Sequence, residues 1–146
     1  MTRLNRDVVD RLCSLVKDEL AAVETYRLAL DTLGDRPECA DLRRIQNDHE
    51  EAVSLLQERV ASAGVEPPTR SGAWGWWLSA LEGAAQLIGE RAALKALRDG
   101  EERDIADYEQ AMDDRALDRD LKELIGAHIL PKTRAHLSVL DQYAGG

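Results

Sequence analysis

The chain has 146 residues and a formal net charge of −9, with no Phe and few other aromatic residues. That length fits one domain with a sizeable core, and the charge argues against nucleic acid or an anionic membrane as the main partner. No segment combines the length and the apolarity needed to cross a bilayer. Because Leu, Ala, Glu and Arg favour helix, we expect a single all-α domain over residues 1–146, in the cytoplasm.

The first half of the chain predicts a helical hairpin. Apolar residues recur at steps of three and four over residues 5–33, where Asn5 can cap the helix start and Gly34 can end it. A second stripe of the same kind follows over residues 37–63 and stops before a Gly and two Pro residues.

The second half predicts another hairpin, with helices over residues 90–113 and 117–143. Pro131 interrupts the last apolar stripe, so we expect a kink there. Residues 64–89 form a long crossover that contains a short helix, and about 15 helical residues would span roughly 22 Å. We expect this crossover to let helix 90–113 start at the end where helix 5–33 starts. Two hairpins with a long crossover have the connectivity of a ferritin-like four-helix bundle.

The two hairpins are related by an internal repeat. A shift of 82 residues in the first helix and of 79 in the second superposes an ordered set of polar residues. The matched pairs are Glu19 with Glu101, Tyr26 with Tyr108, and His49 with His128. We interpret this match as a duplication of one hairpin.

Four charged residues occupy stripe positions that are normally apolar: Glu19, His49, Glu101 and His128. Counted from the turn of its own hairpin, each of the four lies at a similar position along the bundle, within about one helical turn of the others. They can therefore converge in the core. Two carboxylates and two imidazoles suit Fe, Mn or Zn. The alternative is a metal-free polar network in which the same groups hydrogen-bond to one another and to the two tyrosines.

Three further residues are secondary candidates for a metal ligand. Glu24 and Glu102 lie at the edge of the apolar faces of their helices, and His136 lies eight residues beyond His128. A ferritin-type di-iron site needs Glu-x-x-His in two helices, but Gln46 and Ile125 occupy the Glu positions. We therefore expect no complete ferroxidase site, and no residue is a candidate for catalysis.

Several short motifs resemble a bacterial family of ferritin-like four-helix bundles of unknown function, some of them linked to stress responses. The matching residues are Ser71-Gly72, Trp76-Trp77, Glu24-Thr25-Tyr26, Gly100-Glu101 with Tyr108, and a late histidine, His136. The resemblance implies the fold rather than an activity. It favours His136 as the fourth ligand, whereas the internal repeat favours His128.

All the tryptophans, Trp74, Trp76 and Trp77, lie in the crossover. They can cap the bundle or form a homodimer contact, since exposed aromatic clusters mark interfaces. Two functions follow from the sequence. One is a metal-binding bundle with a metal-handling or stress-protection role. The other is a metal-free structural or interaction module that acts as a helical dimer.

Overall fold

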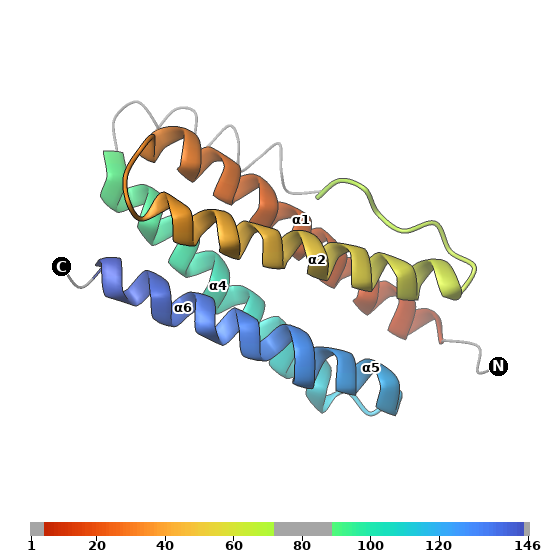
Figure 1. Ribbon diagram of the computed structural model, residues 1–146. Coiled ribbons are helices and arrows are strands. Elements are labelled where there is room, and N and C mark those ends of the chain that lie inside the picture. The colour runs from red at the N-terminus through yellow and green to blue at the C-terminus, as the bar shows by residue number, and fades with distance from the viewer. Residues whose placement is uncertain (1–4, 72–88, 145–146) are drawn as a thin grey trace.

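The computed structural model describes residues 5–71 and 89–144, and in these residues the chain is helical and contains no strand (Figure 1). The first three long helices are α1 (Arg6–Leu33), α2 (Cys39–Ser62) and α4 (Gly89–Asp113). The last is continuous and consists of α5 (Arg119–Glu123), the π-helix η1 (Leu124–Ile129) and α6 (Leu130–Ala144). The prediction of an all-helical bundle is confirmed. Most of the predicted crossover, with its short helix and its tryptophans, lies outside the described residues.

The α1–α2 hairpin follows the signals at its ends. The Asn5 side chain accepts a hydrogen bond of 2.9 Å from the backbone N–H of Asp7, which caps the start of α1. Gly34 ends α1 with a φ of 66°, a left-handed conformation that glycine adopts without steric cost. The second helix begins at Cys39, two residues later than the expected start at Pro37. The remaining helix ends also agree with the sequence within a few residues.

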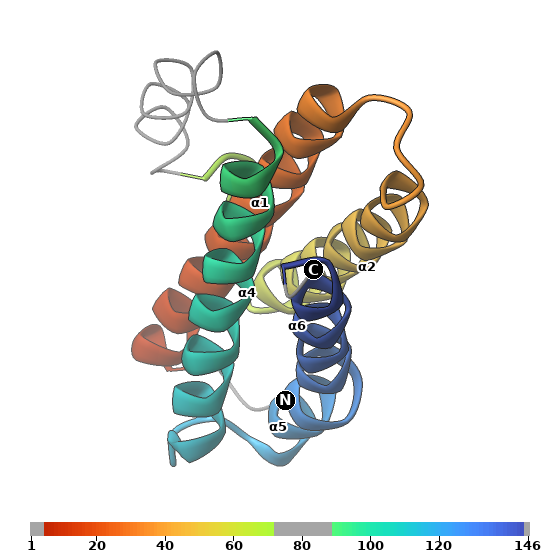
Figure 2. The ribbon, with the colours of Figure 1, turned by 90° about the vertical axis from the view of Figure 1, so that its left-hand side faces the viewer.

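Helix α1 packs against both α2 and α4, and α4 packs against α6 (Figure 2). Helices α1 and α4 are antiparallel, because Arg11 pairs with Asp114 at one end and Arg36 pairs with Glu90 at the other. Helix α4 thus begins where α1 ends, and our expectation that it starts at the same end as α1 was wrong. Helix α2 returns the chain to the end where α1 began, whereas α4 begins at the opposite end, where Glu90 pairs with Arg36.

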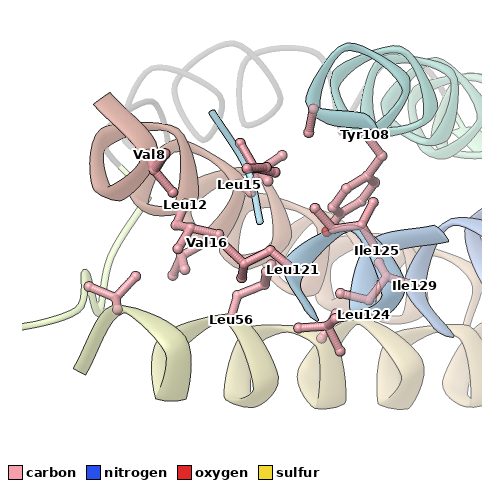
Figure 3. Close-up of a cluster of buried hydrophobic side chains, with 14 of the residues drawn as sticks. Val8, Leu12, Leu15, Val16, Leu56, Tyr108, Leu121, Leu124, Ile125 and Ile129 are labelled. Atoms are coloured by element: carbon pink, nitrogen blue, oxygen red, sulfur yellow. The ribbon is translucent and has the colours of Figure 1, made fainter. Parts of the chain in front are cut away.

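Two apolar clusters form the core, one toward each end of the bundle. The first gathers side chains such as Leu12, Leu56 and Leu121 from α1, α2 and α5 (Figure 3). The second contains Leu42, Leu97 and others near the opposite end. Burying each such leucine contributes about 1.5–3 kcal/mol, so these layers hold the helices together. Between them lies a buried layer of polar and charged residues.

The last helix carries a π-helical turn just before Pro131. The backbone N–H of Leu130 bonds to the carbonyl of Ile125, five residues earlier instead of four. Proline has no N–H and its ring collides with the carbonyl four residues before it in an α-helix. At the place where we predicted a kink, the structure has a wider, π-helical turn over Leu124–Ile129. None of the described helices is both long and apolar enough to span a membrane.

Candidate metal centre

His49 of α2 lies at the middle of the polar layer, between two carboxylates. Its Nδ1 is 2.5 Å from Oε2 of Glu19 on α1, and its Nε2 is 2.6 Å from Oε1 of Glu101 on α4. All three side chains are only 1% exposed. The first hairpin and α4 of the second hairpin therefore meet in one buried ion cluster.

Two tyrosines hold the carboxylates in a reciprocal arrangement. Tyr26 of α1 donates a hydrogen bond of 2.7 Å to Oε1 of Glu101 on α4. Tyr108 of α4 donates one to Oε1 of Glu19 on α1. Each tyrosine lies seven residues, about two helical turns, after the glutamate of its own helix. Because α1 and α4 are antiparallel, this spacing places each hydroxyl beside the glutamate of the other helix. The repeat thus gives a local pseudo-twofold arrangement.

His136 of α6 approaches the cluster from the other side of His49. The two imidazole rings have centroids 5.0 Å apart. Nε2 of His136 is 2.8 Å from Oδ2 of Asp48, and its Nδ1 is 3.4 Å from Oε2 of Glu101. Within the described part of the chain, neither that Nδ1 nor that Oε2 has a hydrogen-bond partner, and both atoms are buried. Two buried polar atoms without partners thus face each other.

The cluster fixes the charges of its members. Burial alone would lower the pKa of His49, but Glu19 and Glu101 raise it well above its usual value, so the ring is an imidazolium at neutral pH. Burial alone would raise the pKa of Glu101, but the neighbouring His49 and His136 lower it to about 2. Burial, with the nearby carboxylates adding to it, raises the pKa of both tyrosines, which therefore stay neutral donors.

A further carboxyl, Asp104 of α4, lies three residues after Glu101 and is 4% exposed. Burial and the charge of Glu19 raise the pKa of Asp104 well above its usual value. Ligand atoms of Glu19, His49 and Asp104 lie within 4.8 Å of one another, as do those of His49, Glu101 and His136. Both sets could hold a metal ion.

A cleft of about 240 Å³ leads from the surface to the cluster between α2 and the η1–α6 segment. Glu19, His49 and His136 form its inner wall. Lys132, Glu51 and the exposed His128 also line it. A larger hollow of about 460 Å³ between α2 and α6 is also lined by Asp48 and His136, and a much smaller one of about 40 Å³ lies between α1 and α4. The buried groups are therefore accessible to a small solute mainly from the α2 side.

Of the four ligands expected from the sequence, the structure brings Glu19, His49 and Glu101 together and leaves His128 exposed on η1. The secondary candidate His136 takes the place expected for His128. Contacts of α6 with α4 set this register, since Glu101 lies beside His136 and Glu109 lies beside Arg134. His128, eight residues earlier, is about 12 Å nearer the turn. Counting residues from the hairpin turn selected His128 instead of His136, because the helices of the second hairpin pair in a different register from those of the first.

Of the two glutamates at the stripe borders, Glu24 is partly exposed and Glu102 is exposed. Glu24 pairs with Arg27 at 3.0 Å, and Glu102 is exposed with Arg98 3.7 Å away. The sequence analysis missed Asp48 and Asp104. Asp104 follows Glu101 by three residues and so shares its face, a spacing that could have identified it. Asp48 precedes His49 directly and points about 100° away from it on the helix, toward α6 rather than α1.

No family model, curated protein or solved structure that was compared with this chain matches it. What the site does must therefore be argued from its own residues.

Proposed function

We propose that this chain is a ferritin-like helical bundle that binds one divalent transition-metal ion, Fe, Mn or Zn, through His49, Glu101 and His136. One observation carries the proposal. Each histidine is held at one ring nitrogen by a carboxylate, and its other nitrogen faces Glu101. Carboxylate-held histidines of this kind are the usual surroundings of a protein-bound metal, because the outer carboxylate fixes the ring and raises its basicity.

The facing atoms of His136 and Glu101 need something between them. In the neutral tautomer of His136 whose Nε2–H donates to Asp48, Nδ1 presents a lone pair to Glu101, whereas the lowering of the pKa of Glu101 by His136 corresponds to a proton on Nδ1. Two acceptors repel each other unless a proton or a cation lies between them. A buried cation would give both atoms a partner.

The spacing of the donors is compatible with a small ion. Ligand atoms bonded at about 2.1 Å to one ion lie about 3.0–3.4 Å apart in octahedral or tetrahedral geometry. Nδ1 of His136 and Oε2 of Glu101 are 3.4 Å apart, while Nε2 of His49 and Oε1 of Glu101 are 2.6 Å apart. The second pair would open by a few tenths of an ångström when an ion replaces the proton on His49. Two histidines and one carboxylate leave coordination positions open, as in mononuclear iron sites.

Specific contacts also favour a second candidate, the metal-free interaction module. His49 already forms a closed ion triad with Glu19 and Glu101, and both tyrosines are satisfied by that triad. In this case the cluster orders the core and the function rests on protein contacts, with the three crossover tryptophans as the proposed homodimer surface. The triad leaves the Nδ1 of His136 without a partner, which is why we prefer the metal site.

A metal-handling or stress-protection role is the broader function that we propose for such a site. Complete di-iron ferroxidase chemistry is outside the proposal. The positions three residues before His49 and His136 hold Gln46 and Thr133, so the glutamates of Glu-x-x-His are replaced.

The test compares metal content and thermal stability. Protein purified without chelator is analysed for transition metals, then stripped with EDTA and melted with and without Fe²⁺, Mn²⁺ or Zn²⁺. Metal at a hundred times its Kd should stabilise the fold by about 2.7 kcal/mol, or about 8 °C for a chain of this size. The proposal is wrong if no metal co-purifies and none of the three ions moves the Tm.

A further inference from the structure

The cleft between α2 and the η1–α6 segment has an acidic outer part, formed by Glu51 and by Asp48, the carboxylate that holds His136. Asp48 and Glu51 lie one turn apart on α2 and both line the cleft. Lys132 of α6 reaches between them, with its Nζ 3.9 Å from Oδ1 of Asp48 and 3.6 Å from Oε2 of Glu51. All three side chains are partly exposed, so these contacts are weak and easily broken.

One of the outer carboxylates, that of Asp48, is linked directly to a buried ligand. Oδ2 of Asp48 is 2.8 Å from Nε2 of His136, whose other nitrogen is the unpartnered atom beside Glu101. His136 is 5% exposed and lines the same cleft as Lys132. Oxygen and nitrogen atoms that can bind a cation therefore follow one another from the surface to the core.

We infer that this cleft is the entry path for the metal ion and that Lys132 regulates it as a tethered cation at its outer carboxylates. The inference rests on the proposed metal site. An incoming divalent ion loses its water in steps, and the carboxylates of Glu51 and Asp48 replace that water before the ion reaches His136. The ammonium of Lys132 occupies the same pair of carboxylates, so it competes with the ion and repels it.

Electrostatics sets the size of the expected effect. A single positive charge about 6 Å from the path of a divalent ion slows its entry by up to about tenfold at the dielectric constant of water. Salt screens this effect, because the Debye length falls to about 3 Å at 1 M. Removal of the charge at Lys132 should therefore accelerate metal loading strongly at low ionic strength and little at high ionic strength.

The competing route is the small hollow between α1 and α4, on the other side of the cluster. It is lined by Asp18, Asp104 and the exposed Arg103. Its volume of about 40 Å³ is about one-sixth of that of the 240 Å³ cleft, and a hollow of about 460 Å³ that is also lined by Asp48 and His136 lies between α2 and α6 as well, which favours the α2 side. Arg103 takes the place of Lys132 on this route, so the two routes can be distinguished by substitution.

The experiment follows the binding of Co²⁺, whose visible absorption reports its coordination, by rapid mixing with the metal-free full chain. Lys132→Met should bind Co²⁺ about three to ten times faster than the wild type at low ionic strength. Lys95→Met, which makes the same change of net charge beside Asp99 on α4, should have a rate close to that of the wild type. Glu51→Gln should slow loading, whereas Glu50→Gln, its exposed neighbour in sequence, should not.

Each outcome decides between specific alternatives. Equal rates for Lys132→Met and Lys95→Met, with normal Co²⁺ binding at equilibrium, would overturn the entry path and leave the metal site intact. Faster loading in Arg103→Met alone would assign entry to the α1–α4 side and would also overturn the inference. If the wild type binds no Co²⁺ at equilibrium, the proposed function fails and the entry path with it.

Discussion

Replacing Glu101 by Gln tests the buried ion cluster with almost no change of volume. The amide that Glu101→Gln introduces can still accept a hydrogen bond from Tyr26, but the substitution removes one of the two negative charges that hold His49 as an imidazolium. Breaking a buried ion pair by removing one partner costs about 3–5 kcal/mol. Because Glu19 stays in place, we expect a loss near the lower end, about 3 kcal/mol. For 146 residues this corresponds to a fall in Tm of about 10 °C.

The assay is urea unfolding of EDTA-treated protein, followed by circular dichroism, with Glu102→Gln as the matched control. Glu102 is the next residue, and its only described ion-pair contact is with Arg98 at 3.7 Å on the surface, so its substitution should cost less than about 0.5 kcal/mol. Similar losses for the two variants, at unchanged urea dependence, would refute the account of the cluster.

Three further predictions concern the two tyrosines, His136 and Asp18. Tyr26→Phe and Tyr108→Phe should each lower the unfolding free energy by about 1.5–3 kcal/mol in urea titrations, since each removes a buried hydrogen bond to a charged group; a large difference between them would contradict the pseudo-twofold arrangement. His136→Ala should abolish the stabilisation by Zn²⁺ in thermal melts, whereas His128→Ala, at an exposed position, should keep it; the opposite result would restore the register expected from the repeat. Burial and the neighbouring carboxyl of Asp107 on α4 raise the pKa of Asp18 in the folded protein to about 8. The protonated form of Asp18 therefore stabilises the fold at acid pH. This contribution falls as the pH rises from about 4 to 8. Asp18→Asn should flatten that fall in unfolding free energy, measured at several pH values, and an unchanged slope would show that Asp18 is not the group responsible.

Helical periodicity was enough to find the centre of the polar layer. Glu19, His49 and Glu101 stand out because a charged residue on an apolar stripe points into the core whatever the details of packing. The order of the helices and most of their ends also follow from local signals, such as the cap at Asn5 and the turn at Gly34. These features depend on spacing within one helix.

The direction of α4 and the fourth member of the cluster depend on contacts between helices. The register of α6 against α4 is fixed by pairs such as Arg98 with Asp141, and by the π-helical turn before Pro131. Such pairs have no signal in the spacing of a single helix. The repeat therefore pointed to His128, although His136 lies beside Glu101. Asp48 was missed for a related reason, because its role depends on a helix that the pattern of α2 does not specify.

The central claim is that His49, Glu101 and His136 hold a metal ion in the core. The most direct test is an anomalous difference map from crystals of the full chain grown with Zn²⁺, recorded on both sides of the zinc absorption edge. We predict one strong peak between Nε2 of His49, Nδ1 of His136 and the carboxylate of Glu101. A map without a peak at that position, or with peaks only at surface carboxylates, would contradict the account.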